Sequence, residues 1–179
     1  MKTLFLLRHA KSGFDEPPVR DVDRQLNEKG RRAARTVGRH LRDTAATFDH
    51  VIASPARRVA ETLAEVEAGY GRTLSPLIDK RLYLACVETL LDLIHALPPE
   101  AASALLVGHN PGLEELVLAL VPDAADQPLR DDVELKFPTA SVAELAFDGD
   151  WHAVKPNAAM LKRFTRPRDL DPALGPEEG

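Results

Sequence analysis

Two histidines each follow an apolar run of the chain. His9 comes after residues 3–7 and Arg8, and His109 comes after residues 104–108. Short apolar runs of this kind are typical of buried strands, and the carboxyl ends of parallel strands border one crevice where ligands bind. We therefore expect the two histidines to share one active site, although a hundred residues separate them.

Two helix starts are predicted close to these strand ends. Ser54-Pro55 follows a third apolar run, at 51–53, and Asn110-Pro111 follows His109 directly. In both, a residue favoured at the N-cap precedes a proline, which is favoured at the first helical position. Unpaired N–H groups at a helix start bind phosphate, and Arg58, in the first turn after Ser54-Pro55, could clamp the same anion with two hydrogen bonds.

Two arginines and two histidines beside two helix starts predict a site for a tetrahedral oxyanion, and phosphate fits best. A neutral imidazole can attack phosphorus, and the phosphohistidine that forms is then hydrolysed. The second histidine can hold a phosphate oxygen and stabilise charge in the transition state. Each residue taken alone is more often structural or merely exposed, so the hypothesis depends on their combination and order in the chain.

The elements that must position these residues alternate along the chain. Apolar runs at 4–7, 51–53 and 105–107 are separated by segments of helical periodicity at 33–41, 59–70, 87–97 and 113–120. This pattern predicts an α/β fold, a three-layer sandwich with a mostly parallel central sheet and helices on both faces. Alternation at 142–147, the turn at 148–150 and a further run at 151–155 predict a C-terminal antiparallel hairpin.

The length of 179 residues fits one domain, which we place at residues 1–165. Residues 166–179 contain prolines and few apolar side chains, and we expect an extended tail there that could be disordered. The stretches 12–25 and 122–138 are expected to be irregular.

Composition restricts the partners. The net charge is −5, yet residues 1–60 carry 13 Lys and Arg against 7 Asp and Glu, which favours an anionic ligand at this part of the chain. An acidic chain without a basic patch interleaved with aromatic residues is not expected to bind nucleic acid, and no apolar stretch is long enough to span a membrane. The single Cys86 cannot form an internal disulfide, and no secretory leader is evident, so a cytoplasmic protein is expected. The oligomeric state stays open.

Four ordered motifs carry a resemblance to a known family. They read Leu-Arg-His-Ala-Lys-Ser at 7–12, Asp-Arg-Gln-Leu-Asn-Glu-Lys-Gly at 23–30, Ser-Pro-Ala-Arg-Arg-Val-Ala-Glu-Thr at 54–62 and Val-Gly-His-Asn-Pro at 107–111. Together they resemble the histidine phosphatase superfamily, which includes the phosphoglycerate mutases, and the likeness extends from Leu4 to about Lys162. Lys11-Ser12, the Gly-His-Asn-Pro form and the short chain resemble the SixA-like branch, the phosphohistidine phosphatases.

The resemblance implies a phosphoglycerate mutase-like fold and a role for each matching residue. It makes His9 the nucleophile, Arg8 and Arg58 the phosphate clamps, and His109 the second histidine of the phosphate pocket. It implies neither a metal nor a cofactor. At the rim of the pocket Ser12 and Arg24 are weaker candidates for phosphate binding, and a structural role is equally open for them.

The resemblance is incomplete at the general acid. Larger phosphatases and mutases of the superfamily have a Glu or Asp after the third strand, and here only Glu88 lies in that region, where we expect it to be a surface charge on a helix. General acid catalysis contributes roughly 10²–10⁴-fold. Its absence therefore favours phosphohistidine, whose imidazole is a good leaving group, over alkyl phosphates.

The sequence therefore predicts a metal-independent phosphatase that acts through a phosphohistidine on His9, with a phosphorylated protein as substrate. One alternative is a phosphomonoesterase or mutase on a small phosphorylated metabolite. Another is a binding module for phosphorylated ligands without turnover, against which the intact His9 argues. A magnesium-dependent phosphotransfer site at 21–23 is disfavoured because these residues follow no apolar strand.

Overall fold

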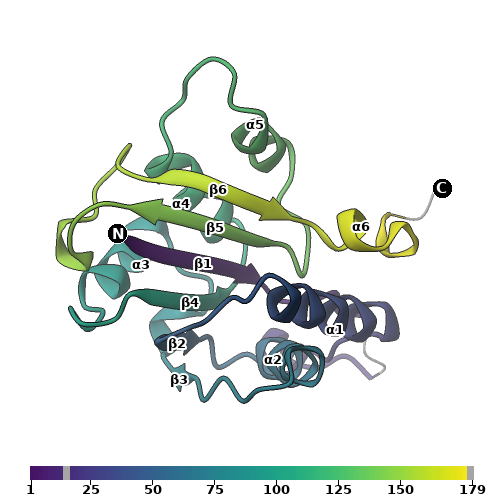
Figure 1. Ribbon diagram of the computed structural model, residues 1–179. Helices are drawn as coiled ribbons and strands as arrows, with labels where there is room; N and C mark the ends of the chain where they lie inside the picture. Colours follow the sequence, from purple (N-terminus) through teal and green to yellow (C-terminus); the bar gives the residue numbers. More distant parts are fainter. Residues whose placement is uncertain (14–16, 177–179) are drawn as a thin grey trace.

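The computed structural model describes residues 1–13 and 17–176, and six strands of the described chain form one sheet in the order β3-β2-β4-β1-β5-β6 (Figure 1). Neighbouring strands are parallel from β3 to β1, whereas β5 is antiparallel to β1 and β6 antiparallel to β5. The sheet is therefore mixed but mostly parallel. The strands are β1 (Lys2–Arg8), β2 (His50–Ala53), β3 (Leu77–Ile78), β4 (Ser103–Gly108), β5 (Val142–Phe147) and β6 (Met160–Thr165).

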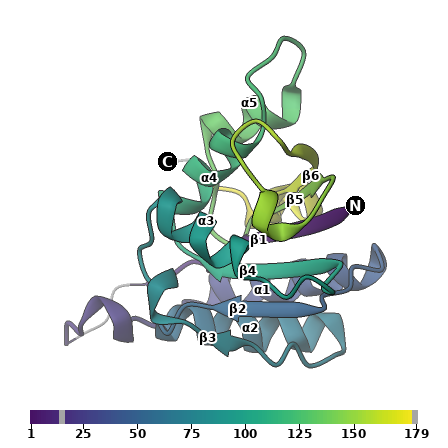
Figure 2. The same cartoon turned by 90° about the vertical axis from the view of Figure 1, so that its left-hand side faces the viewer.

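Helices cover both faces of this sheet, which makes the three-layer sandwich that the sequence predicts (Figure 2). One face is covered by α1 (Glu28–Asp43) and α2 (Arg57–Tyr70), and the other by α3 (Val87–His95) and α4 (Gly112–Leu120). The remaining helices are α5 (Pro128–Leu135) and α6 (Pro167–Leu170), and short 3-10 turns occur at Asp21–Asp23, Lys80–Leu82, Trp151–Ala153 and Pro172–Leu174. None of the described helices combines the length and apolarity needed to cross a bilayer.

The central strand β1 shows why the layers form. Leu4 and Leu6 point into the apolar cluster under α3 and α4, while Phe5 and Leu7 point into the cluster under α1 and α2. Successive side chains of a strand alternate between the two faces, so a continuous apolar run is buried on both sides. Such burial stabilises the fold by roughly 1.5–3 kcal/mol for each large side chain, and it holds the end of β1 in one place.

Strand register brings the site residues to one edge of the sheet. Arg8 at the end of β1 lies opposite Gly108 at the end of β4, and Ala53 at the end of β2 lies opposite Val107. These three parallel strands thus end side by side. The segments that follow them, beginning at His9, Ser54 and His109, leave the sheet at neighbouring points.

The sequence predicts an antiparallel strand pair at the C-terminal end, and this pair forms, but its second strand is not the predicted one. Strand β5 forms as expected, but residues 151–153 form a 3-10 turn, and the partner strand is β6, farther along the chain. Trp151 is fully buried, and its indole N–H donates to the Ala101 carbonyl at 2.8 Å. The indole thereby anchors the turn at 151–153 beside α3, with Trp151 in the core.

Two segments expected to be irregular contain helices. Residues 128–135 form α5 within the stretch 122–138, and a 3-10 turn occupies Asp21–Asp23 within the stretch 12–25. Residues 14–16 of that stretch lie outside the described chain.

The prediction of an extended tail is wrong for residues 166–176. They form α6 and a 3-10 turn, and Leu170 and Leu174 pack against the apolar cluster of α1 and α2 (Figure 1). At the start of α6 the Asp169 carboxylate accepts from the Arg166 amide at 2.9 Å and from the Arg166 guanidinium, and Lys29 at the start of α1 donates to the Gly175 carbonyl. The two leucines and these polar contacts hold the segment against the domain. Residues 177–179 lie outside the described part of the chain, and the domain boundary at 165 stays a prediction.

Candidate active site

Backbone hydrogen bonds tie together the segments that follow the strands. The His9 amide donates to the Gly108 carbonyl and the Ser54 amide to the Val107 carbonyl, both at 3.1 Å. From the loop before β5, the Ala140 amide donates to the carbonyl of His9 at 3.0 Å. These bonds fix the backbone on which the side chains of the site are mounted.

The His9 ring is held in one tautomer. Its Nδ1 lies 2.7 Å from the Ala10 carbonyl oxygen, which can only accept a hydrogen bond. Nδ1 must therefore carry the proton, and in the neutral ring the lone pair is on Nε2. This is the atom that could attack phosphorus.

The His109 ring is held in the opposite tautomer by different partners. Its Nδ1 lies 3.2 Å from Nη2 of Arg58, and its Nε2 lies 2.8 Å from Oγ of Ser54. A guanidinium only donates, so Nδ1 accepts and Nε2 carries the proton that is donated to Ser54. The ring centroids of His109 and His9 lie 5.2 Å apart, so the structure brings the two predicted histidines together.

Burial and nearby cations keep both rings neutral. The pKa of His9 is lowered to about 3, mainly by desolvation and in addition by the nearby Arg58, His109 and Arg8. Desolvation, Arg58 and Arg8 likewise lower the pKa of His109 to about 4. At neutral pH His9 therefore keeps its Nε2 lone pair, which is the protonation state that a nucleophile needs.

Arg58 is the cation in contact with His109. Its side chain is 5 % exposed, and it also donates to Asp21, to the backbone carbonyl at 2.7 Å and to Oδ2 at 3.1 Å. The Tyr83 hydroxyl donates to the same carboxylate oxygen, and the Tyr83 ring stands edge-on to His109 with centroids 5.3 Å apart. An oxyanion that binds both terminal nitrogens of Arg58 would therefore compete with Asp21 for them.

Asp21 is ionised in this arrangement. The hydrogen bond from Tyr83 is the largest cause that lowers the pKa of its carboxyl, and the bond from Arg58 adds to it. Asp21 consequently has no proton to give to a leaving group at neutral pH.

Arg8 lies beside the histidines with most of its donors unused. Its Nη1 donates to the Phe137 carbonyl at 2.9 Å, and its buried Nε has no hydrogen-bond partner among residues 1–13 and 17–176. Asn110 donates to the same Phe137 carbonyl at 2.9 Å. A guanidinium offers five N–H donors, so Arg8 retains donors for an anion.

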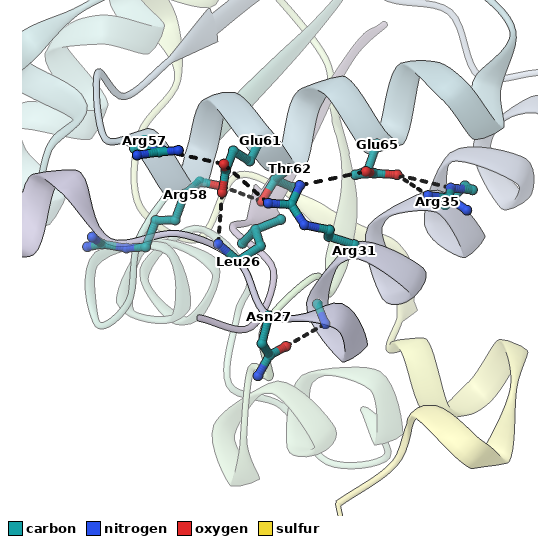
Figure 3. A network of polar contacts seen from close by, with 10 residues as sticks. Leu26, Asn27, Arg31, Arg35, Arg57, Arg58, Glu61, Thr62 and Glu65 are labelled. Atoms are coloured by element: carbon teal, nitrogen blue, oxygen red, sulfur yellow. Dashed lines mark hydrogen bonds and ion pairs between the residues drawn. The ribbon is translucent and has the colours of Figure 1, made fainter. Parts of the chain in front are cut away.

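Polar side chains of α2 hold the segments next to the site in place (Figure 3). The Thr62 hydroxyl donates to the Arg58 carbonyl at 2.6 Å and accepts from the Ala10 amide at 2.9 Å. The adjacent Glu61 accepts from the Leu26 amide at 2.8 Å and forms an ion pair with Arg31 of α1 at 3.3 Å. These contacts join the segment after His9 and the segment before α1 to the helix that carries Arg58.

The two helix starts differ from the predicted ones. Helix α2 begins at Arg57 with Ala56 at the N-cap, and α4 begins at Gly112 with Pro111 at the N-cap. Ser54 lies before the cap because its hydroxyl accepts from His109 and from the Ala56 amide at 3.2 Å. The residue that looked like a cap thus orients a histidine.

The two weaker candidates, Ser12 and Arg24, do not reach the histidines. The Ser12 hydroxyl is buried and finds no partner in the part of the chain that the structure describes. Arg24 reaches the site only through Asp21, 3.7 Å away, and also donates to the Gly13 carbonyl. Phosphate binding by Ser12 and Arg24 stays a prediction.

Glu88 lies in the first turn of α3, is fully exposed, and has a lowered pKa that keeps it ionised. Within residues 1–13 and 17–176, no cluster of His, Cys, Asp and Glu has the arrangement of a metal site.

Sequence reasoning missed Asp21, Tyr83 and the supporting roles of Ser54 and Thr62. The spacing of four between Arg58 and Thr62 placed both on one helix face, which could have indicated the role of Thr62. Nothing in the local sequence indicates that Asp21 and Tyr83 meet at Arg58, because they are 62 residues apart.

Comparisons with known proteins fit this geometry. The profile of the histidine phosphatase superfamily (branch 1) matches residues 4–83. An uncharacterized protein of Mycobacterium leprae (strain TN) is 32% identical over 167 residues, which are 90% of this chain and all of the relative.

Two solved structures share the fold over almost the whole chain. A candidate phosphohistidine phosphatase SixA from Nakamurella multipartitia is 30% identical with a TM-score of 0.81, covering 93% of this chain and 96% of that one. Another, from Agrobacterium tumefaciens, is 30% identical with a TM-score of 0.76, covering 93% and 98%. The chain belongs to the histidine phosphatase superfamily, branch 1, and has its phosphoglycerate mutase-like α/β fold.

Proposed function

We propose that the protein is a metal-independent phosphatase that transfers a phosphoryl group to His9 and then to water. The observation that carries this proposal is the hydrogen bond from His9 Nδ1 to the Ala10 carbonyl, which leaves the Nε2 lone pair free beside Arg8 and Arg58. Nε2 attacks phosphorus, a P–N bond forms, and the bond to the leaving group breaks. Water then attacks the phosphohistidine, which releases inorganic phosphate and restores the neutral ring.

Cationic and hydrogen-bonding groups around His9 would stabilise the transition state. The phosphoryl oxygens take the place of Asp21 as acceptors from Arg58, and Arg8 donates to them through its unused N–H groups. His109 donates from Nε2 when an oxygen of the anion replaces Ser54 Oγ as the acceptor. Preorganised donors of this kind contribute roughly 10²–10³-fold each to the rate.

The proposed substrate is a phosphohistidine side chain of another protein. The imidazole of this side chain departs without a strong acid. Asp21 and Glu88, the two carboxylates considered as a general acid, are both ionised. Two solved relatives are described as candidate phosphohistidine phosphatases, which supports the same substrate class.

Replacement of the nucleophile tests this mechanism. His9→Ala should abolish turnover of a phosphohistidine protein and of an aryl phosphate, because no other neutral imidazole in the site has a free nitrogen lone pair. The parent protein quenched in alkali during turnover should carry phosphate on His9 by mass spectrometry, because the P–N bond of phosphohistidine is stable in alkali and labile in acid. His152→Ala, which removes an exposed histidine, is the control. Full activity of His9→Ala, or loss of activity with a chelator and its return with Mg²⁺, would refute the covalent histidine mechanism.

A leaving-group series tests the missing acid. Glu88→Gln should leave hydrolysis of phosphohistidine, aryl phosphates and alkyl phosphates unchanged, because Glu88 is an ionised surface group. Alkyl phosphates should be poor substrates with either residue. A loss of ~10²-fold or more confined to alkyl phosphates would identify Glu88 as a general acid.

One observation favours a second candidate, a phosphomonoesterase acting on small molecules. A pocket of about 320 Å³ that is rich in cations adjoins Arg8, and a pocket of this volume suits a metabolite better than a folded protein. Parallel assays with a phosphohistidine protein and a panel of phosphorylated metabolites separate the two candidates. Absence of turnover on both, with retained phosphate binding, would indicate the binding module instead.

A further inference from the structure

A cavity of about 320 Å³ lies at the junction of α1 and the C-terminal segment. Its walls come from the start of α1, the segment after His9, the loop before β5, and residues 166–176. Within residues 1–13 and 17–176, it is lined by six cationic side chains and by no carboxylate. The six are Arg8, Lys11, Lys29, Lys136, Arg166 and Arg168.

Among the residues that the structure describes, only Arg166 of these six cations has a carboxylate partner. Arg166 is paired with Asp169 at 3.0 Å, and Lys29 donates to a backbone carbonyl. Across residues 1–13 and 17–176, Lys11, Lys136 and Arg168 form no ion pair. Cations gathered around one hollow repel each other and raise the local concentration of anions, so an anion that enters relieves the repulsion.

The size and lining of the cavity indicate a small molecule. Its volume is at the lower end of the roughly 300–1,000 Å³ typical of metabolite sites, whereas a protein partner usually covers about 800 Å² of surface. Apolar side chains, among them Ala33, Pro138 and Leu174, lie between the cations. They would contact the carbon atoms of an organic anion.

Arg8 connects this cavity to the candidate active site. It lines the cavity, precedes His9 in the chain, and retains donors beyond the one used by the Phe137 carbonyl. An anion in the cavity therefore shares a cation with a phosphoryl group at His9.

We infer that this cavity binds a small molecule that carries at least two phosphoryl groups. The molecule is either a substrate whose second anionic group occupies the cavity or a separate ligand that acts on the site through Arg8. The cavity site itself is independent of the proposed turnover, because its cations other than Arg8 lie outside the candidate active site.

Calorimetric titration with inorganic pyrophosphate tests the inference. The parent protein and His9→Ala should both bind pyrophosphate, and more tightly than orthophosphate. The double variant Lys136→Ala/Arg168→Ala should raise the Kd for pyrophosphate by about tenfold or more, since hydrogen bonds between charged groups are the strong ones. Lys155→Ala removes an exposed cation elsewhere on the chain and should leave the Kd unchanged. Circular dichroism and the Tm of each variant verify folding.

An unchanged Kd in the folded double variant, or equal Kd values for pyrophosphate and orthophosphate, would overturn the inference. Inhibition of aryl phosphate hydrolysis then separates the two sources. Competitive inhibition by pyrophosphate identifies the second group of a substrate, and non-competitive inhibition identifies a separate ligand. Pyrophosphate binding by His9→Ala is measured without turnover, so failure of the proposed phosphatase activity would leave this result intact.

Discussion

At the scale of single residues, the site depends on competition for one guanidinium. Arg58 donates to Asp21, while the same Nη2 approaches His109 at 3.2 Å. The carboxylate is half exposed, and Tyr83 helps to hold it there. Asp21 thus compensates the buried charge of Arg58 until an oxyanion takes its place.

Removal of the Asp21 charge should strengthen oxyanion binding. Asp21→Asn keeps a similar shape but competes less for Arg58, so the inhibition constant of a phosphate analogue such as tungstate should fall several-fold, consistent with roughly 1 kcal/mol for a partly exposed ion pair. Asp23→Asn, which alters a neighbouring carboxylate paired with Arg20, is the control. Weaker tungstate binding by Asp21→Asn would mean that Asp21 mainly orients Arg58.

At the scale of elements, the close crossing of α1 and α2 positions Arg58. A Cβ at Gly38 would lie 2.2 Å from the Val66 carbonyl oxygen, and a Cβ at Gly69 would lie 2.1 Å from the Arg35 carbonyl oxygen. Each helix therefore presents a glycine to the backbone of the other. Glu61 and Glu65 of α2 add ion pairs to arginines of α1 along the same contact (Figure 3).

Gly38→Ala should therefore destabilise the protein although alanine is the better helix former. The methyl group forces the helices apart, and overpacking of this kind costs typically about 1–3 kcal/mol. The free energy of unfolding in urea measures the effect, and Thr36→Ala on the same helix should change it by less than about 0.5 kcal/mol. A Gly38→Ala protein as stable as the parent would show that the two helices can separate freely.

The arginines of α1 have a role that depends on the neighbouring helix. Taken alone, the five arginines between positions 31 and 42 would form the polar face of an amphipathic helix. In the structure Arg31 and Arg35 pair with Glu61 and Glu65 of α2, and Arg42 pairs with Asp43. Much of this charge therefore serves the contact between the helices.

At the scale of the whole molecule, two neutral histidines couple stability to pH. The folded pKa values of His9 and His109, about 3 and about 4, lie below the ordinary value of 6.5 that the unfolded chain regains. As the pH falls below 6.5, the unfolded state binds protons that the folded state does not. Stability is therefore present above pH 6.5 and is lost progressively between pH 6.5 and about 4.

The expected loss approaches about 1.4 kcal/mol per pH unit for each histidine once the pH is well below 6.5. Urea unfolding measured between pH 7 and pH 4.5 gives this slope. His9→Gln should reduce the slope, whereas His152→Gln, at an exposed position, should not. A slope identical in His9→Gln and the parent would mean that His9 is protonated in the folded state. His40, whose pKa is also lowered by burial, contributes to the slope in all of these proteins.

The sequence by itself determined the layers and the candidate residues of the site. Unbroken apolar runs predicted β1, β2 and β4, and the periodicity of apolar residues predicted α1 to α4, because both signals arise within a few neighbouring residues. The same short-range patterns placed His9 and His109 directly after two parallel strands, at one edge of the sheet.

Only the tertiary structure decided what depends on contacts between distant segments. The partner of β5 is β6 and not the nearer run, because burial of Trp151 removes that run from the sheet. Residues 166–176 fold because Leu170 and Leu174 find the cluster under α1 and α2, and this docking creates the cationic cavity. Asp21 meets Arg58 across 37 residues, and such a contact leaves no trace in local composition. Local periodicity reports which face of an element is buried, whereas the partner that buries it is decided by the packing of the whole chain.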